Sequence, residues 1–458
     1  MSKDDPKLIA AAKALIAEVA SALDAPVAVE LWDGSIHPLG QTADSALAIV
    51  ITEPGVIASI LKRPSLDRII SHYAAGKLAL KGGSLIDLGR AVEAHGDSRR
   101  RLQSLSKAKV ARLLMPFLWV PSTPAEDARS YAGNDSGTGR SKSENKDFVS
   151  FHYDVSNAFY DLFLDPEMQY SCAYYTDWTN GLEQAQRDKL DMICRKLRLK
   201  PGERFLDIGC GWGGLVCHAA EHYGAIAHGI TLSERQLERA RERIVARGLQ
   251  DRVNVEIRDF NDLEGRYDKI ASIGMYEHIG LASRERYFKT VRRVMAPDGL
   301  FLNHAISRRA KRKTQAFRAR AEQRALQKYI FPGGELDDIG STLRIMEQVG
   351  FEVHDVEGWR EHYARTTALW CERLMAREAD AIALVGAPTY RIWIAYLAGC
   401  SLAFSRGTAR IFQTLVSYSA KQASPLPPTR ADLYAPHPGL AAAPIVDAVD
   451  TADDIKPR

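Results

Sequence analysis

A regular alternation of short apolar runs and helix-length segments is the feature that most constrains the fold of this chain. Between residues 204 and 356 the apolar runs predict six strands, at 204–208, 226–231, 253–258, 267–273, 300–305 and 352–356. Helix-length segments separate them, for example 233–246 and 283–295. Because strands joined by helices run parallel and are covered on both faces, the sequence predicts an α/β fold built on a parallel sheet.

A glycine-rich turn follows the first predicted strand, in the stretch FLDIGCGWGG at 205–214. Glycines let the backbone turn sharply and approach a ligand with no Cβ in the way. The turn lies at the carboxyl edge of the sheet, where folds of this kind bind ligands. Alone it is a weak signal, because nicotinamide and flavin enzymes use similar turns and a tight strand-to-helix turn needs no ligand.

Two carboxylates favour S-adenosylmethionine (SAM) over a dinucleotide. Asp207 lies just before the glycines, where it would repel a pyrophosphate but can serve a cationic amino-acid group. Asp259 ends the third strand, where it can accept from an adenine amine. The second strand ends in GITLSERQ, without the acidic residue that holds a ribose in dinucleotide sites. In that stretch Ser233 also fits a helix N-cap, with Gln236 completing a capping box.

Composition excludes several classes of protein. The 458 residues are 46% hydrophobic and 26% charged, as in an ordinary globular protein. With 61 Lys and Arg against 57 Asp and Glu, the net charge of +4 gives no overall case for nucleic-acid binding. The six cysteines lack the spacing of a zinc site, so no metal is expected. No run of about 18 apolar residues predicts a membrane span.

Changes in composition divide the chain into four parts. Residues 1–120 mix helical patterns with short strands, at 27–32 and 46–52, and predict a smaller α+β domain. Residues 121–146 are rich in Gly, Ser, Asn and charge, and predict a flexible linker. The alternating pattern occupies 147–423. Pro, Ala and Asp dominate 424–458, which predicts a loosely ordered tail.

Several motifs together resemble those of the cyclopropane-fatty-acyl-phospholipid synthases and the related mycolic acid cyclopropane synthases. They are the aromatic segment FVSFHYDVSNAFYDLFLDPEMQYSCAYY at 148–175, FLDIGCGWGG, GITLSERQ, GMYEHIG at 274–280, KYIFPGGEL at 328–336, HYARTTALW at 362–370 and IWIAYLAGCSLAF at 392–404. The resemblance covers about 147–420. It implies a Rossmann-like class I SAM methyltransferase domain with a mainly parallel seven-stranded sheet, preceded by a lipid-associated N-terminal domain.

The resemblance also implies a reaction, the addition of a methylene from SAM across a cis double bond of a phospholipid acyl chain. Methyl transfer to an alkene leaves a carbocation, so the site must exclude water and offer a base. Family members hold bicarbonate as that base. Its ligands carry over to Cys172, Glu277, His304, the backbone of Ile306, and Tyr363.

Each of these residues also has an ordinary structural explanation. Cys172 fits a small buried side chain, and His304 at a strand end fits a core histidine with satisfied hydrogen bonds. Tyr363 fits one face of an amphipathic helix, and Glu277 with His278 fits the capped start of the fourth helix. Their common membership of the family motifs is what favours the catalytic interpretation.

The predicted cofactor-binding residues come from three of these motifs and from the end of the third predicted strand. They are Tyr153, Tyr170, Ser171, Asp207, Gly209, Gly211, Thr231, Leu232, Gln236, Asp259 and Phe260. The aromatic side chains of 148–175 are expected either to line an apolar tunnel, to cover the sulfonium by cation–π contact, or to pack in the core. These aromatic candidates are Tyr153, Phe159, Tyr160, Tyr170, Tyr174 and Tyr175.

A phospholipid substrate requires contact with a bilayer. Residues 308–328 carry nine Lys and Arg against one Glu, which favours a membrane-contact helix near Arg308, Arg309, Arg312 and Lys313, although a solvated surface helix fits equally. We expect a cytoplasmic protein held peripherally at the inner face of the membrane. A homodimer is an open alternative, since family members can dimerise.

Three other functions stay open at the level of sequence. The same cation could lose a different proton and give a methyl-branched or methylene fatty acid. A catalytically silent lipid-binding protein is disfavoured by the intact Asp207, Glu277, His304 and Tyr363. A small-molecule methyltransferase is disfavoured by the long aromatic segment.

Overall fold

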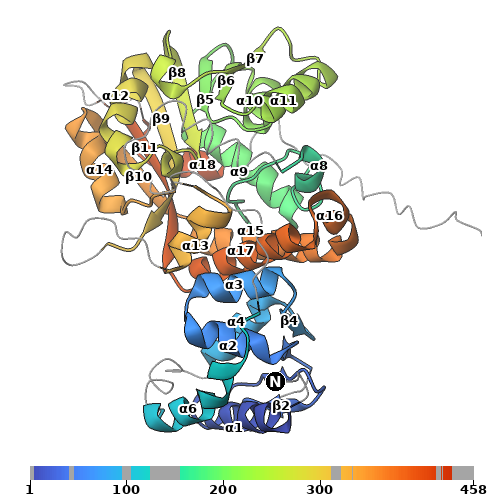
Figure 1. The fold of residues 1–458 in the computed structure, drawn as a ribbon. Helices are drawn as coiled ribbons and strands as arrows, with labels where there is room; N and C mark the ends of the chain where they lie inside the picture. Colours follow the sequence, from blue (N-terminus) through green and yellow to red (C-terminus); the bar gives the residue numbers. More distant parts are fainter. Residues whose placement is uncertain are drawn as a thin grey trace, which may run out of the picture.

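The computed structural model describes residues 5–40, 46–94, 105–123, 155–310, 321–332, 334–418, 424 and 426–435. A large domain with a seven-stranded sheet occupies the upper part of Figure 1, and a smaller N-terminal domain lies below it. Helices α15 and α17 lie along the lower side of the large domain, so that they separate its sheet from the N-terminal domain.

The large sheet has the strand order β10-β11-β9-β8-β5-β6-β7. All pairs among β5, β6, β7, β8 and β9 are parallel, whereas β11 pairs antiparallel with both β9 and β10. The strands are β5 (Arg204–Ile208), β6 (Ile226–Thr231), β7 (Val253–Ile257), β8 (Tyr267–Ile273), β9 (Met295–Arg308), β10 (Phe351–Gly358) and β11 (Ala409–Tyr418). The mainly parallel seven-stranded sheet predicted from the sequence is confirmed.

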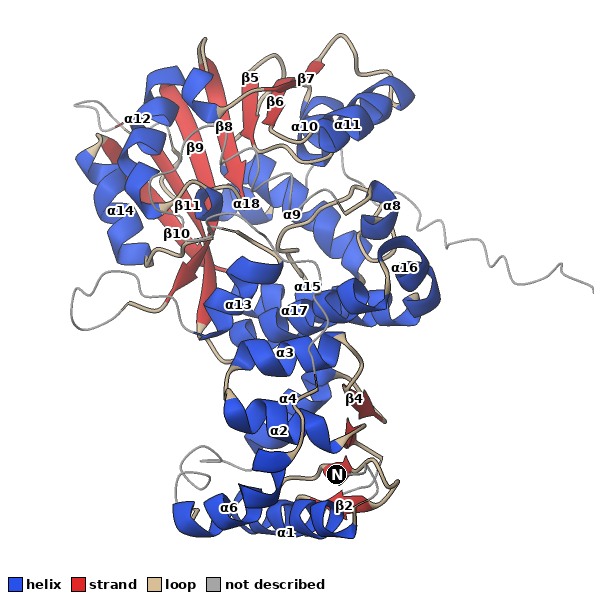
Figure 2. Ribbon diagram, viewed as in Figure 1, coloured by secondary structure: helices blue, strands red, loops and turns tan. Residues whose placement is uncertain are grey.

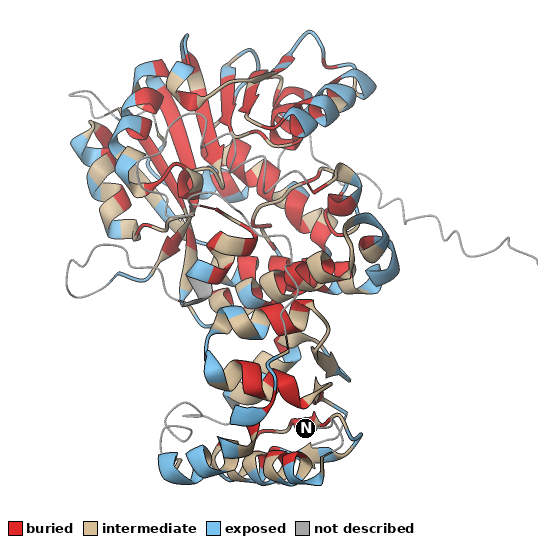
Figure 3. Cartoon of the chain, in the orientation of Figure 1, coloured by how far each residue is buried: buried red, intermediate tan, exposed pale blue. Residues whose placement is uncertain are grey.

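Helices cover both faces of this sheet, because neighbouring side chains of each strand point to opposite sides. On β5, Phe205 packs in one core with residues of α9, α10 and α11, while Leu206 packs in another with residues of α12 and α14. These helices are α9 (Leu182–Lys196), α10 (Gly214–Tyr223), α11 (Glu234–Ala246), α12 (Arg284–Val294) and α14 (Ile339–Gln348). Figure 2 shows the strands between these helices, and Figure 3 shows the buried residues concentrated along them.

The remaining helices of the large domain lie around the carboxyl edge of the sheet and below it. They are α8 (Asn157–Tyr160), α13 (Ala321–Tyr329), α15 (Arg360–Ala376), α16 (Glu378–Val385), α17 (Ala387–Ser405) and α18 (Ala431–Tyr434). Three 3₁₀ turns add to them, η2 (Phe260–Asp262), η3 (Tyr276–His278) and η4 (Leu281–Ser283). Helices α8, α15 and α17 contribute to one aromatic core with the segment that follows α8.

The N-terminal domain is an α+β unit with the four-stranded sheet β2-β1-β3-β4. Its strands are β1 (Ala28–Glu30), β2 (Ile36–Pro38), β3 (Ala48–Ile51) and β4 (Leu78–Lys81). Its helices are α1 (Pro6–Leu23), α2 (Pro54–Lys62), α3 (Leu66–Ala74), α4 (Leu85–Ala94) and α6 (Lys107–Leu114), followed by the 3₁₀ turn η1 (Met115–Trp119). The two strands predicted in this part are confirmed as β1 and β3.

Helices α3 and α4 of the N-terminal domain pack on α17 and α13 of the large domain. A Cβ on Gly89 of α4 would lie 2.4 Å from Cδ1 of Leu402 on α17, so these two helices are in close contact. The guanidinium of Arg391 donates to the carbonyl of Ala74 at 3.0 Å. The α17 helix therefore has one side in the aromatic core and the other against the N-terminal domain.

A second contact joins α3 to α13. The Tyr329 hydroxyl donates to Asp67 at 2.7 Å and lies 3.1 Å from the Ser71 hydroxyl. The Lys328 ammonium pairs with the same Asp67 carboxylate at 2.8 Å. Since Lys328 and Tyr329, the last two residues of α13, begin the KYIFPGGEL stretch, the N-terminal domain is fixed directly to one of the family motifs.

The sequence predicted a flexible linker at 121–146 and a loosely ordered tail at 424–458. The linker predicted for 121–146 lies outside the described residues except for 121–123, where the Thr123 N–H donates to the Gly55 carbonyl at 3.3 Å. Within the tail predicted to be loosely ordered, α18 packs on the large domain instead. Leu433 is buried, and Asp432 pairs with Arg198 just beyond α9.

The basic stretch 308–328 is not a single helix, contrary to the prediction. Arg308 is the last residue of β9, and Arg309 and Ala310 lie in neither a helix nor a strand, whereas the described helix α13 runs from Ala321 to Tyr329. Strand β9 continues this far because the antiparallel strand β11 supplies a partner for it up to the Ala409–Arg308 pair. Arg312 and Lys313 lie outside the described residues.

Candidate active site

The glycine turn after β5 has the backbone geometry that its sequence predicts. Gly209, Gly211 and Gly213 have φ values of +85°, +54° and +80°, a region that disfavours residues with a Cβ. The N–H groups of Gly209 and Cys210 donate to the Ile230 carbonyl, which fixes the turn to the end of β6. The turn is therefore anchored at the carboxyl edge and leaves room beside it.

A cavity lies at this edge of the sheet. It is lined by the ends of β5, β6 and β8, by the glycine turn, and by the segment 168–171. Among the predicted cofactor residues, those that line it are Tyr170, Ser171, Asp207, Gly209, Gly211, Thr231, Leu232, Gln236 and Phe260. The structure thus brings together nine residues, eight from three separate motifs and Phe260 from the segment after β7.

Two predicted cofactor residues are not part of this lining. Tyr153 lies outside the described residues. Asp259 caps the turn η2, where its carboxylate accepts from the Asn261 backbone N–H at 2.8 Å, and the neighbouring Arg258 and Phe260 line the cavity in its place. An acidic residue before a short turn commonly makes this cap, so the adenine-binding role of Asp259 stays a prediction.

Asp207 gives the cavity a buried carboxyl group. Burial raises its pKa to about 7, and the nearby Lys189 partly offsets this rise. Its Oδ1 atom has no hydrogen-bond partner among the described residues. A buried carboxylate without a partner is costly, so a cationic ligand group in the cavity would satisfy it.

The end of β6 holds Gln236 in place. The Thr231 hydroxyl donates to the Gln236 side-chain oxygen at 2.7 Å, and Ser233 caps α11 by accepting from the Gln236 backbone N–H at 3.3 Å. The predicted N-cap is confirmed. The Gln236 side chain, however, bonds to Thr231 and faces the cavity rather than completing a capping box.

The segment before Cys172 packs directly on the glycine turn. A Cβ on Gly214 would lie 2.2 Å from the Gln169 side-chain nitrogen and 2.7 Å from the Glu167 carbonyl. Trp212 of the turn donates through its indole N–H to Asn157 at 2.9 Å. The glycines therefore serve two contacts, one with the cavity and one with the aromatic segment.

Glu277 is a second buried carboxyl group, beyond the end of β8. Burial raises its pKa to about 7, while the backbone N–H groups of Glu277 and Ile306 donate to it and lower the pKa in part. Its Oε2 atom has no partner among the described residues. Glu277 lies in the 3₁₀ turn η3, and not at the start of α12 as predicted, because η4 intervenes.

His304 is buried in the middle of β9, not at a strand end. Its Nδ1 atom lies 3.0 Å from the amide nitrogen of Gln413 on β11, and its Nε2 atom has no partner among the described residues. Burial lowers the pKa of His304 well below its usual value, and the positive charges of Lys189, Lys196 and His362 lower it further. His304 is therefore a neutral imidazole with one nitrogen available.

Cys172 and Tyr363 lie around the same region. Cys172 is fully buried and donates weakly to the carbonyl of Trp359, whose ring packs edge-on against His304 at 5.1 Å. Burial raises the pKa of the Cys172 thiol well above its usual value, so it stays protonated. The Tyr363 N–H bonds to the Trp359 carbonyl at 3.1 Å, which links both residues to Trp359.

Aromatic side chains form an apolar wall beside the cavity. The Tyr170 hydroxyl, at the cavity, lies 3.0 Å from the Tyr396 hydroxyl on α17. Tyr396 packs edge-on against Phe331, which in turn contacts His278 at the cavity lining. Of the other aromatic candidates, Phe159 and Tyr160 are buried core residues, and Tyr174 and Tyr175 stack on His362.

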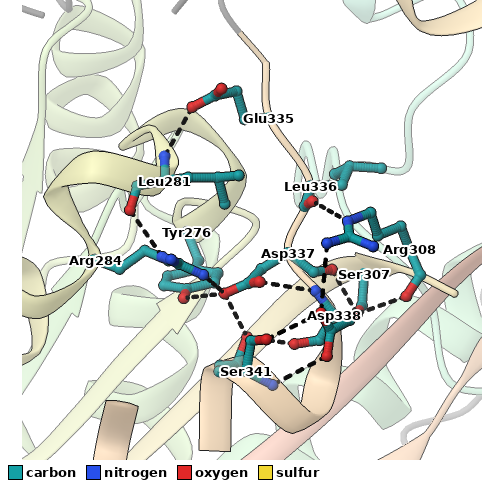
Figure 4. Close-up of polar contacts among 11 residues, drawn as sticks. Tyr276, Leu281, Arg284, Ser307, Arg308, Glu335, Leu336, Asp337, Asp338 and Ser341 are labelled. Carbon is teal, nitrogen blue, oxygen red and sulfur yellow. Dashed lines mark hydrogen bonds and ion pairs between the residues drawn. The ribbon is translucent and has the colours of Figure 1, made fainter. Parts of the chain in front are cut away.

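The stretch 335–341 is fixed across the ends of β9 and η4 by polar contacts (Figure 4). Asp337 accepts from Arg284 and from the Tyr276 hydroxyl, and the Glu335 carboxylate accepts from the Leu281 N–H at 2.8 Å. Arg308 donates to the Leu336 carbonyl and pairs with Asp338. Arg308 is thus engaged within the protein, which corrects its assignment to the membrane-contact group.

Several residues that shape the site were not predicted from the sequence. Gln169, Trp212, Met275 and His278 line the cavity, and Lys189 is fully buried behind it. The first four lie within the quoted motifs, which could have identified them. Lys189 and Gln413 had no comparable signal, since Lys189 lies in an ordinary amphipathic helix pattern and Gln413 lies in a segment for which no strand was predicted.

The six cysteines, all within the described residues, are free. Among the residues that the structure covers, no group of His, Cys, Asp and Glu is placed to hold a metal ion. None of the helices it describes has the length and apolar character needed to cross a bilayer.

Comparison with known proteins agrees with this geometry. The family model for mycolic acid cyclopropane synthetase matches residues 140–414. A probable fatty acid methyltransferase of Pseudomonas putida is 40% identical over 415 residues, covering 90% of this chain and 97% of that protein. The cyclopropane-fatty-acyl-phospholipid synthase of Escherichia coli K12 is 38% identical over 267 residues, covering 58% of this chain and 66% of the synthase.

A solved structure gives the same result for the fold. The crystal structure of mycolic acid cyclopropane synthase CmaA1 with S-adenosylhomocysteine (SAH) and CTAB superposes with a TM-score of 0.56 at 31% identity, covering 59% of this chain and 97% of that one. The large domain accordingly has the class I SAM methyltransferase fold. The chain belongs to the cyclopropane synthase family, and it is a SAM-dependent methyltransferase.

Proposed function

We propose that this protein transfers a methylene from SAM to the cis double bond of unsaturated acyl chains in membrane phospholipids, forming cyclopropane fatty acids. One observation carries the proposal. The cavity at Asp207 lies beside a buried region in which Glu277 and His304 each present a polar atom without a partner among the described residues. Such groups next to an apolar aromatic wall suit a reaction that develops positive charge in a dry site.

The cavity residues fit SAM as the donor. When bound, SAM supplies an electrophilic sulfonium methyl group. Asp207 would accept from its cationic amino group, and the glycine turn would let the backbone approach it without a Cβ in the way. Tyr170 lines the cavity with its ring, where it can face a sulfonium by cation–π contact.

The buried polar atoms fit a small anion as the base. His304 Nε2 and the backbone of Ile306 would hold bicarbonate, together with Glu277, Cys172 and Tyr363. A base held there would take the proton that the new methyl group must lose for the ring to close. With its pKa raised to about 7, Glu277 is protonated part of the time at neutral pH and can then donate to an anion.

Exclusion of water from the site would decide whether the carbocation closes to a ring or is captured as an alcohol. A carbocation on the acyl chain would react with any nearby water to give an alcohol. Trp359 and Trp370 are fully buried around Cys172 and Tyr363. Tyr170, which lines the cavity, packs its ring on Trp370 at 5.2 Å and lies 3.0 Å from the Tyr396 hydroxyl. This enclosure supports an apolar substrate over a small polar one.

A second candidate is a fatty acyl methyltransferase that gives a methyl-branched or methylene product. The P. putida relative, named a probable fatty acid methyltransferase, covers nearly all of this chain, whereas the E. coli synthase aligns with little more than half of it. All these products arise from the same cation. The ring forms by loss of a proton from the new methyl group, a methyl-branched alkene by loss of a chain proton, and an exocyclic methylene by a hydride shift followed by loss of a methyl proton. One site can therefore serve any of them.

Access to phospholipid requires membrane contact. Arg309 is exposed just beyond the end of β9, in the same basic stretch as Arg312 and Lys313. We place these three cations, without Arg308, at an anionic bilayer surface on the inner face of the membrane. A homodimer is compatible with this arrangement and needs a measurement of mass in solution.

The test uses purified full-length protein, vesicles of unsaturated phospholipid, and SAM with a trideuterated methyl group, with and without added bicarbonate. Fatty acids are then released and analysed by mass spectrometry. A cyclopropane product retains two deuterium atoms, because one leaves as the ring closes. An acyclic methyl-branched alkene with three deuterium atoms would establish the second candidate instead. So would an exocyclic methylene product, which also retains two deuterium atoms but, unlike the ring, is cleaved by ozone at its C=CD₂ bond. Labelled product formed equally well after removal of bicarbonate would exclude that anion as the base.

A further inference from the structure

Helix α9 places a lysine in the interior behind the cofactor cavity. Lys189 is fully buried, and its ammonium donates to the Ser171 hydroxyl at 3.0 Å and to the side-chain oxygen of Gln169. Both of these residues line the cavity, whereas Lys189 does not. Lys189 thus acts on the cavity through the two residues that it holds.

Charged and titratable groups face Lys189 from several elements. Asp165, Glu167 and Cys172 face it from the aromatic segment, and Asp207 faces it from the end of β5. His304 on β9 also experiences its charge. The groups that face Asp207 in turn are Lys189, Cys194, Cys210 and Tyr287. Among them only Lys189 is cationic.

We propose that Lys189 is a positioning residue for the methyl donor, which fixes Gln169 and Ser171 against the cavity and keeps Asp207 as a carboxylate when the donor binds. This inference rests on the assignment of Asp207 to donor binding, and it is independent of which acyl product forms. The donor's amino group is cationic, so a neutral Asp207 would lose the charge attraction.

The directions of the pKa shifts agree with this role. Burial raises the pKa of Asp207 to about 7, and the ammonium of Lys189 limits the rise. Burial lowers the pKa of Lys189 to about 8, and the negative charges around it limit the fall. Between these two values both groups are charged, and that is the range in which the cationic donor should bind best.

The test measures the dissociation constants of SAM and SAH between pH 6 and pH 9 by calorimetry, with the full-length protein. For the wild type we expect binding to weaken as the pH falls through about 7. Lys189→Met should move this midpoint upward by about one pH unit or more, and should weaken SAM binding at pH 7 about tenfold. Lys189→Arg should retain most of the affinity.

Lys196→Met is the matched control. Lys196 lies on the same face of α9 and is equally buried, but it pairs with Glu357 and Asp355. We expect this variant to keep the wild-type midpoint for SAM binding. If Lys189→Met fails to fold, Lys189→Gln provides the same comparison, since it can still donate to Ser171 but has no charge.

Two results would overturn the proposal. One is a folded Lys189→Met or Lys189→Gln variant with the wild-type midpoint and affinity. The other is an equal shift in Lys196→Met, which would mean that any buried charge on α9 has this effect. A wild type without a midpoint, or an Asp207→Asn variant that keeps it, would instead refute the assignment of Asp207. Neither outcome depends on the acyl product.

Discussion

The Nδ1 atom of His304 lies 3.0 Å from the side-chain nitrogen of Gln413, at positions that pair directly across β9 and β11. An amide NH₂ group can only donate, so Nδ1 accepts and the ring proton of the neutral imidazole is on Nε2. Nε2 is the nitrogen without a partner among the described residues. Gln413 therefore leaves His304 with an N–H donor for an anion.

Gln413→Glu should reverse this arrangement. A carboxylate at position 413 accepts from Nδ1–H, which moves the proton away from Nε2 and raises the pKa of His304. We expect nitrogen-15 NMR of histidine-labelled protein to show the changed tautomer, with turnover falling at least about tenfold. Gln348→Glu, at an exposed position on α14, should change neither quantity. An unchanged His304 spectrum in Gln413→Glu would contradict the tautomer assignment.

Glu277→Gln should lose most turnover, bind SAM normally and gain stability at alkaline pH. Burial raises the pKa of Glu277 from 4.5 to about 7, so the folded state keeps a proton that the unfolded state loses. The stability contributed by Glu277 therefore falls as the pH rises from about 4.5 to about 7. Removing this titration should stabilise the protein at pH 8 by about 3 kcal/mol and by nothing near pH 4.

Denaturant unfolding at both pH values measures this difference. Glu285→Gln, at an exposed position on α12, is the control and should be neutral in stability and turnover. Wild-type turnover in Glu277→Gln would remove that carboxyl group from the reaction.

Gly214→Ala should weaken SAM binding by displacing the aromatic segment. Its Cβ would lie 2.2 Å from the Gln169 side chain and 2.7 Å from the Glu167 carbonyl, so the segment must move. We expect a loss of about 1–3 kcal/mol in stability and a clearly higher dissociation constant for SAM. Gly181→Ala is the matched control, because its Cβ would meet only the Glu183 side chain at 3.7 Å. Equal SAM affinity in both variants would argue against this packing as a determinant of the cavity.

Charge reversal at Arg309, Arg312 and Lys313 should release the protein from anionic vesicles. We expect the combined Arg309→Glu, Arg312→Glu and Lys313→Glu variant to lose about 3 kcal/mol of binding, or about 100-fold in partitioning. Cosedimentation with vesicles at low salt measures this loss. An equal charge change at Arg239, Arg241 and Lys289, which are exposed on α11 and α12, is the control. If both variants bind alike, the basic stretch is not the contact site.

Tyr329→Phe should loosen the contact between the two domains. The change removes the hydroxyl that donates to Asp67 and lies 3.1 Å from Ser71. We expect a loss of about 1–2 kcal/mol in stability and faster amide hydrogen exchange in α3 and α13 than in the wild type. Tyr434→Phe, which removes an exposed hydroxyl, should leave the exchange of both helices unchanged. Unaltered exchange in Tyr329→Phe would show that this hydroxyl does not hold the domains together.

The sequence predicted the parallel half of the sheet well, for a physical reason. The bounds of β5, β6 and β8 coincide with the predicted runs, because strands covered on both faces bury apolar side chains along most of their length. Strand β11 escaped prediction, since it buries the polar side chains of Gln413, Thr414 and Ser417 and so lacks an apolar run. Without β11, the extension of β9 to Arg308 could not be predicted either.

The residues of the site likewise fall into those that the sequence predicted and those that it did not. Motif residues such as Asp207 and Gln236 were predictable because their spacing follows the turns at the sheet edge. The role of Lys189 was not, since a lysine in an amphipathic helix normally indicates a solvent-exposed face. Only the tertiary structure turns that face of α9 inward, toward Ser171 and Asp207.

The packing of α4 on α17 determines which truncated forms of this enzyme can be studied. Gly89 admits Leu402 so closely that the two helices share one packed layer, and the same α17 supplies Tyr396, whose hydroxyl meets Tyr170 at the cavity. Removing the first 120 residues to obtain a minimal catalytic fragment would also remove α3 and α4, which pack on this helix. In such a fragment, apolar side chains of α17 would be exposed to solvent, and Tyr396 would hold Tyr170 less firmly at the cavity. Its kinetics would therefore differ from those of the intact enzyme.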